Sequence, residues 1–180
     1  MRSSYRQLID TTIKTLHQWL PPAHFGEFSV TNMTYQVKAL PECEVEILFR
    51  ALDRPDHVAN LLSLELTAAW INEARETNWT IVEAIQGRIG RFPPIREGGP
   101  TWYGLIMDTN PPDSDSKWYK FFEEWLPGPE GQEADLAYRE RHGRPLAQIF
   151  KQPSGLSAAA ENLPNLIPGY YETLAAGKSK

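Results

Sequence analysis

The chain has little cysteine, no long apolar run and an excess of negative charge. Its one thiol, Cys43, cannot form an internal disulfide, which fits a reducing compartment. No apolar run reaches the roughly 18 residues of a membrane span, and no signal core follows Met1, so we expect a soluble protein without a membrane partner. The formal net charge of -5 disfavours strong autonomous binding to nucleic acid, although a small basic patch stays open.

The sequence patterns of three kinds of site are also missing. No GxxxxGK[ST] motif occurs, so the loop that holds nucleotide phosphates in P-loop enzymes is absent. No spaced acidic set of a two-metal nuclease is present. We expect no metal site, because the four histidines have neither metal-binding spacing nor cysteine partners: His17, His24, His57 and His142.

What the sequence does contain is a set of short apolar runs that end in polar residues. The run Leu66 to Ile71 is too apolar for an edge strand and is typical of a parallel strand buried on both faces. Together with Val45 to Ala51 and Trp102 to Met107, it predicts an α/β fold with a mainly parallel sheet and helices on both faces. Glu73 and Asn110 follow two of these runs, so we expect them at one edge of a single sheet.

The remaining pattern divides the chain into a core, residues 1–127, and a peripheral lid or linker, residues 128–180, with no core of its own. Residues 28–51 read as strand, break and strand around Pro41-Glu42. An aromatic helix face follows Lys117, for which a core stripe is favoured over a partner groove: Trp118, Tyr119, Phe122 and Trp125. Helical spacing and caps predict helices over 5–20, 55–62, 80–89, 133–142 and 165–176.

Four segments in this order carry a family resemblance: RALD from Arg50, LLSLELTAAWINEARE from Leu61, GRIGRFP from Gly87 and MDTNPP from Met107. The succession resembles the second half of the ATPase domain of the large terminase subunit of tailed bacteriophages. The resemblance implies an incomplete P-loop-type ATPase domain, whose phosphate loop would precede Met1 and whose nuclease domain would follow Lys180.

The same resemblance implies ATP hydrolysis coupled to packaging of double-stranded DNA in the host cytoplasm. ATP and Mg²⁺ would be the ligands of the parent motor, and other terminase subunits, the portal protein and DNA its partners. Because the phosphate loop is missing, we expect no tight nucleotide binding by this chain, and whether it is an enzyme stays open. The rival hypothesis is a non-enzymatic terminase remnant that binds a motor subunit, the portal or a host factor.

Carried over by residue, the resemblance makes Glu73 the catalytic glutamate of the Walker B strand. Asn72 stands where many relatives have the aspartate that holds Mg²⁺ through water, and its neutral oxygen attracts a metal less. Thr109 and Asn110 match the coupling motif that senses the γ-phosphate. The alternatives are structural: Glu73 could cap a turn or pair with Arg75, and Thr-Asn-Pro is an ordinary turn sequence.

The arginines are weaker candidates. Arg54 and Arg50 are the nearest to an arginine finger supplied to a neighbouring subunit, but neither matches the family's position, and surface salt bridges would explain both. Arg88 and Arg91 lie in a Gly-punctuated turn and could contact phosphate or DNA, or simply cap a helix end. These two arginines would carry a third possibility, a small nucleic-acid-binding module.

Overall fold

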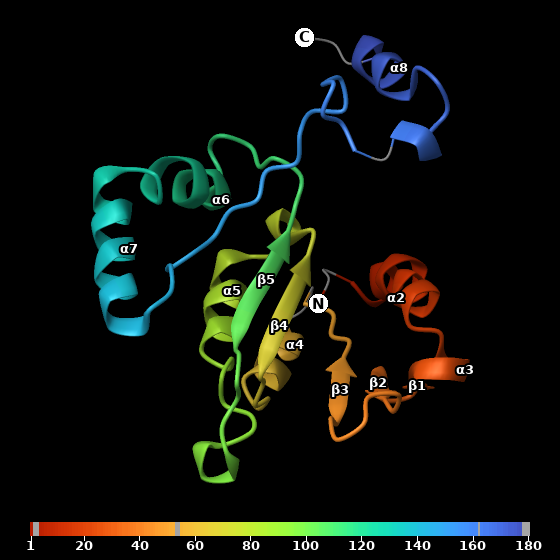
Figure 1. Ribbon diagram of the computed structural model, residues 1–180, viewed down its shortest axis with the longest axis vertical. Coiled ribbons are helices and arrows are strands. Elements are labelled where there is room, and N and C mark those ends of the chain that lie inside the picture. The colour runs from red at the N-terminus through yellow and green to blue at the C-terminus, as the bar shows by residue number, and fades with distance from the viewer. Residues whose placement is uncertain (2–3, 53–54, 162, 178–180) are drawn as a thin grey trace. The chain divides into compact units, whose positions relative to one another are not determined.

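The computed structural model describes residues 1, 4–52, 55–161 and 163–177, and the side chains of Pro55 and Asp56 are not described. The chain divides into two compact units, Met1–Leu126 and Pro127–Lys180. Its five described strands form a three-stranded antiparallel sheet and a two-stranded parallel sheet, so the fold is mixed α/β (Figure 1). Among the described helices, none has the length and apolar content to cross a membrane.

The first unit opens with the helix predicted over 5–20. It runs through α1 (Tyr5–Gln7), the π-helical η1 (Leu8–Ile13) and α2 (Lys14–Trp19). Ser4 and Gln7 form a capping box at its start, which satisfies two backbone N–H groups that a helix end leaves open. Proline follows the last turn and stops the helix, as the sequence predicts.

After the short α3 (Pro22–Phe25), the chain forms an antiparallel meander of β1 (Gly26–Ser29), β2 (Thr34–Val37) and β3 (Val45–Leu48). The predicted single strand before the Pro41-Glu42 break is therefore a hairpin, turned at Val30 to Met33. The preceding helix packs against this sheet in one buried cluster, which consists of Leu8, Ile13, Tyr35, Phe49 and Ala51.

Gly26 is the one position in this meander where a side chain cannot fit. A Cβ built on it would lie 1.9 Å from the carbonyl oxygen of Gln36 and 3.0 Å from the Tyr35 ring. The close approach of β1 to β2 at Gly26↔Val37 therefore requires glycine.

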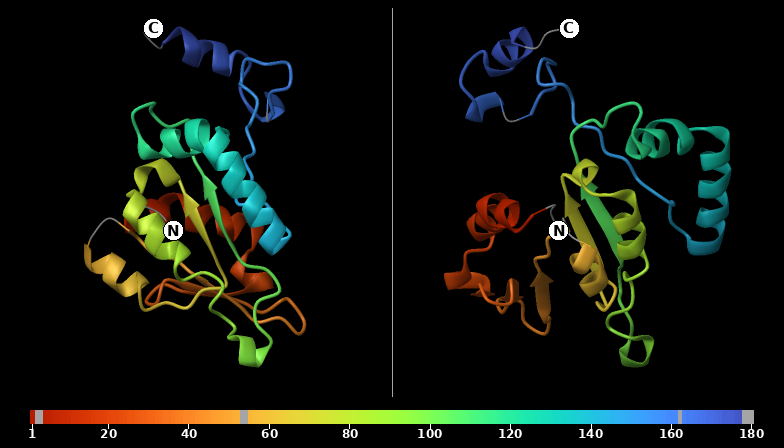
Figure 2. Two further views of the ribbon diagram at one scale, coloured as in Figure 1. Left: turned by 90° about the vertical axis from the view of Figure 1, so that its left-hand side faces the viewer. Right: turned by 180° about the vertical axis from the view of Figure 1, so that it is seen from behind.

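The second sheet consists of β4 (Ala68–Asn72) and β5 (Gly104–Asp108), parallel and in register from Ala68↔Gly104 to Asn72↔Asp108. The helices α4 (Pro55–Leu61) and α5 (Trp79–Gln86) lie behind the two strands in Figure 1, and Figure 2 shows the same arrangement from two other sides. The side chains that fill this core are Leu52, Leu61, Ile71, Ala74, Ile81, Val82, Ile85 and Trp118.

Two expectations about the sheet are wrong. Val45 to Ala51 does not join the strands that end near Glu73 and Asn110, because β3 pairs with β2 in the separate antiparallel sheet. The sheet is consequently not mainly parallel. Val45 and Ile47 alternate with Glu44 and Glu46, which is the pattern of a strand with one wet face, and such strands belong to antiparallel sheets.

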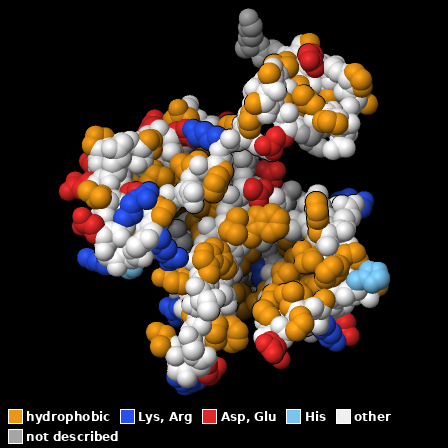
Figure 3. All heavy atoms as spheres, viewed as in Figure 1, with side chains coloured by type: hydrophobic (Ala, Val, Ile, Leu, Met, Phe, Trp, Pro, Cys, Tyr) orange, Lys and Arg blue, Asp and Glu red, His pale blue; other side chains and the backbone are white. Residues whose placement is uncertain are grey.

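Helices cover one face of the parallel pair instead of both. Leu105 and Met107 point into the core with α5, whereas Trp70 and Ile106 on the opposite face are 47% and 54% exposed. Hydrophobic side chains gather on this open face in Figure 3. Among the described residues, β5 pairs only with β4, so its other edge is open.

The aromatic helix after Lys117 consists of α6 (Lys117–Tyr119) and the π-helical η4 (Lys120–Trp125). Trp118 is buried and Phe122 packs on the core, as a core stripe requires. Trp125 lies off this stripe and is half-buried at the surface. The helix therefore has two aromatic faces where one was predicted.

The second unit contains α7 (Pro129–His142), the 3₁₀ turn η5 (Leu163–Asn165) and α8 (Tyr170–Ala176). Both buried hydrophobic clusters consist of residues of the first unit. A hydrogen bond from Arg139 of α7 and one from the backbone N–H of Leu146, beyond the helix, hold the pKa of Asp135 below its usual range. The role of the second unit as a lid or linker stays a prediction.

Candidate functional site

The carboxyl ends of β4 and β5 meet around the carboxylate of Asp108. Trp70 Nε1 donates to Oδ1 at 2.5 Å, and Asn72 Nδ2 donates to Oδ2 at 2.7 Å. The backbone N–H of Glu73 also points to Oδ2, at 3.4 Å. Asp108 thus ties the last residues of β4 to the end of β5 and fixes where Glu73 leaves the strand.

Glu73 has an unusual backbone conformation. Its φ of 53° and ψ of 54° place it in the left-handed region, directly after β4 and before the 3₁₀ turn η2 (Ala74–Glu76). For a residue with a Cβ this costs about 1–2 kcal/mol, and Met33 and Glu42 have the same left-handed conformation in turns elsewhere in the chain. Among the described residues, the Glu73 carboxylate has neither a hydrogen bond nor an ion pair.

Replacing Glu73 with glycine is expected to raise the free energy of unfolding by about 1 kcal/mol relative to Glu73→Ala, because only glycine adopts this φ without strain. The pair is compared by urea unfolding of the full chain. Glu73→Gly should be at least as stable as the unchanged protein. A marked loss of stability in Glu73→Gly would mean that the carboxylate is retained for packing.

The segment after β5 lies beside the one after β4. Thr109 Oγ1 accepts a hydrogen bond from the Arg75 backbone N–H at 3.3 Å and donates to the Asn110 carbonyl at 3.1 Å. Arg75 Nη1 donates to the Pro111 carbonyl at 3.1 Å. Glu73 and Asn110 therefore lie near the same edge, as predicted. Arg75 is not an ion-pair partner of Glu73 in the described part of the chain.

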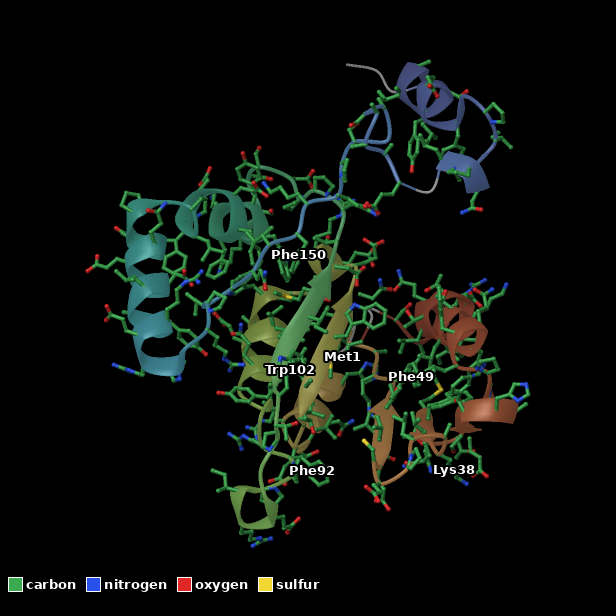
Figure 4. The ribbon with its side chains drawn as sticks, in the orientation of Figure 1. Met1, Lys38, Phe49, Phe92, Trp102 and Phe150 are labelled. Atoms are coloured by element: carbon green, nitrogen blue, oxygen red, sulfur yellow. The ribbon has the colours of Figure 1, made fainter. Side chains whose placement is uncertain are left out.

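Contacts from the N-terminal segment reach the same edge. Thr12 Oγ1 donates to Asn72 Oδ1 at 3.3 Å, and Gln7 Nε2 donates to Glu76 Oε2 at 3.3 Å. The Met1 nitrogen donates to the Trp70 carbonyl, and the Met1 carbonyl accepts from the Asn72 N–H. Met1 thus extends the sheet on the free side of β4, where Figure 4 shows it.

The arginine candidates lie elsewhere. Arg50 Nη1 donates to the carbonyls of Asn32 and Met33 in the turn between β1 and β2 and to that of Phe49 directly after β3, so its guanidinium has a structural role. Arg54 lies outside the described residues. The backbone of 88–91 pairs with 66–67, which places Arg88 and Arg91 at the amino end of β4, the end opposite to Glu73.

The edge residues do not form a metal centre by themselves. No cluster of three or more His, Cys, Asp or Glu that could hold an ion occurs among the described residues. Both functional groups of the Asn72 amide are engaged, by Asp108 and by Thr12. Mg²⁺ prefers one or two free carboxylates together with phosphate oxygens, so this set does not fit a tightly held Mg²⁺.

Sequence reasoning missed the residue at the centre of this edge. Asp108 had no assigned role, although it lies directly before Thr109 and ends an apolar run. Its importance depends on the register Asn72↔Asp108, which brings the donors of β4 to one carboxylate. Sequence reasoning also missed Trp70, which lies on the exposed face of the sheet and donates a hydrogen bond from its indole to Asp108.

Comparison with known proteins adds no relative. No family model, no curated protein and no solved structure matches this chain.

Proposed function

We propose that the chain is part of an ATP-hydrolysing motor domain of the large-terminase kind, in which Glu73 aligns the attacking water. One observation carries the proposal: Glu73 and the Thr109-Asn110 pair lie at the same edge of two parallel strands, held together through Asp108. Open α/β sheets bind ligands at this edge. The register of β4 and β5 thus explains how two motifs that are separate in the sequence meet at one edge of the sheet.

Glu73 suits the role of a water-aligning base. Its backbone is held by a buried strand on one side, where Ile71 is fully buried, and by buried Ala74 on the other. Its carboxylate is free, whereas that of Asp108 is occupied by two side-chain donors. A base held by packed neighbours keeps its position relative to the substrate, which favours proton transfer in the transition state.

Thr109 and Asn110 suit the role of a coupling element. They come directly after Asp108, the last residue of β5. Thr109 Oγ1 accepts a hydrogen bond from the backbone N–H of Arg75, in the segment after Glu73. A change that moves Asn110 would pass through Thr109 to Arg75, and from there to the turn that positions Glu73. Loss of a phosphate beside Asn110 could then be transmitted to the neighbouring elements.

The described residues do not supply a cradle for phosphates. A backbone nest and a lysine provide much of the phosphate binding in such sites, and no lysine lies among the edge residues described above. We therefore propose that ATP hydrolysis, and packaging of double-stranded DNA with other terminase subunits and a portal, take place in a larger assembly to which this chain contributes Glu73, Thr109 and Asn110.

Millimolar Mg-ATP is expected to leave the melting temperature of the isolated chain unchanged. Ligand stabilisation follows RT ln(1 + [L]/Kd), so a Kd far above the ligand concentration gives no shift. Differential scanning fluorimetry with and without Mg-ATP measures it, with Mg-AMP as the control. A clear upward shift that is lost in Glu73→Gln would reveal a phosphate site of another kind.

A second function is favoured by a different observation, the open face and open edge of the parallel pair. Trp70 and Ile106 expose about half of their surface, and a two-stranded sheet with an unpaired edge is marginal by itself. A non-enzymatic remnant that binds a motor subunit, the portal or a host factor would use such surfaces. ATP turnover by a longer chain that carries a phosphate-binding loop separates the two functions.

A further inference from the structure

The helix after Lys117 places a second group of aromatic side chains at the surface, away from Glu73. Phe121 and Trp125 lie on the face of η4 turned away from the core stripe, and their rings stack at 5.1 Å with an interplanar angle of 23°. Trp79, at the start of α5, packs against Phe121 at 5.2 Å. All three residues are half-buried, so part of each remains open to a ligand.

The π-helical turn explains how one helix carries both aromatic faces. Leu126 N–H donates to the carbonyl of Phe121, five residues earlier, which widens the turn. Trp118 and Phe122 consequently point into the core, while Phe121 and Trp125 line a surface pocket. Such turns are frequent at functional sites.

The charged side chains that line this pocket are both lysines, and the Glu83 carboxylate, which is not part of the lining, accepts a hydrogen bond from Trp79 Nε1 at 3.0 Å. The pocket has a volume of about 240 Å³, is open to solvent and is lined by Trp79, Lys117, Lys120, Phe121 and Trp125, without a carboxylate. Lys117 and Lys120 lie one turn apart on the same helix face as Phe121, and neither has an ion-pair partner in the described part of the chain. Two free ammonium groups beside exposed rings favour an anionic ligand with a flat π-surface.

The geometry points to a binding site for single-stranded nucleic acid at this aromatic–lysine pocket. A nucleotide unit has both required features, since the base stacks on a ring and the phosphate pairs with a lysine. A duplex hides the faces of its bases, and an acidic peptide has no base to stack. No aliphatic side chain lines the pocket, which also favours stacking over the binding of a leucine-rich peptide. The inference does not depend on ATP hydrolysis.

Fluorescence anisotropy of a labelled 12-nucleotide oligothymidylate, titrated with the full chain at low salt, tests the site. We expect saturable binding. Replacing both lysines with glutamate (K117E/K120E) should weaken it at least tenfold, because both phosphate partners become repulsive. Trp125→Ala should weaken it about tenfold, as loss of one stacking ring does, while Trp125→Phe keeps most of the affinity.

The matched control is K14E/K38E, which makes the same charge change at exposed lysines far from the pocket in sequence. It should alter affinity less than threefold. An abasic 12-mer and a blunt duplex should both bind at least tenfold more weakly than the oligothymidylate. The inference is overturned by no binding, by equal loss in the two lysine pairs, or by equal binding of the abasic strand. Competition by polyglutamate as effective as that by unlabelled oligothymidylate would likewise overturn it.

Discussion

In a longer chain that carries a phosphate-binding loop, Glu73→Gln is expected to lower ATP turnover by about 100-fold or more while nucleotide affinity changes little. A carboxylate that aligns and deprotonates the attacking water acts in the transition state, so its loss affects kcat much more than binding. Phosphate release at saturating ATP measures the first quantity, and equilibrium titration with a fluorescent ATP analogue measures the second. The amide of glutamine retains the size of the side chain but cannot accept the proton.

Glu97→Gln provides the control for this comparison, since Glu97 is an exposed glutamate in the turn η3 (Ile95–Glu97). It should leave turnover unchanged. Asn110→Ala belongs to the same series: as a coupling residue, it should impair DNA translocation at least as severely as ATP turnover. Normal turnover in both Glu73→Gln and Asn110→Ala would leave the interaction-protein function as the better account.

Gly26→Ala is expected to lower the free energy of unfolding by about 3 kcal/mol, because the added Cβ collides with the backbone of the paired strand. The Gln36 carbonyl lies 1.9 Å from the position of that Cβ, and a backbone atom in a ladder cannot move aside as a flexible side chain can. Urea unfolding followed by tryptophan fluorescence and far-UV circular dichroism measures the loss.

Gly87→Ala is the matched control. Gly87 ends α5 with a φ of -68°, and its added Cβ would meet the Ala84 carbonyl at 3.5 Å, an ordinary contact. Its stability should change by less than about 0.5 kcal/mol. Equal effects of the two substitutions would mean that β1 moves away from β2 without cost.

The strands that form the site follow from the sequence, and so does their meeting edge. The apolar runs ending near Glu73 and Asn110 become β4 and β5, shifted by two residues at most at each start and one at each end. Whether a residue lies at the end of a buried apolar run can be read from the local sequence. Parallel pairing then brings the ends of two such runs to the same edge of the sheet.

What could not be predicted depends on pairing between distant segments. The apolar content of Val45 to Ala51 predicts a strand of the parallel sheet, whereas the alternation of Val45 and Ile47 with Glu44 and Glu46 is that of the antiparallel strand the structure contains. Asp108 was overlooked because its donors lie 35 to 38 residues earlier in the chain, at Trp70, Asn72 and Glu73. The strain at Glu73 has no sequence signature at all, since it is a consequence of how the chain leaves β4.

Thr12 donates a hydrogen bond to Asn72, and Gln7 donates one to Glu76, so the residues on both sides of Glu73 are linked to the N-terminal helix. On one side of this turn lies the core of the parallel strands, and on the other the helix that packs on the antiparallel meander. A rotation of the Asn72 side chain would break its bond to Thr12 and remove one of the two hydrogen bonds that join that helix to the strand end. The turn at Glu73 and the N-terminal helix are therefore linked through side chains whose bonds can be lost without unfolding either element.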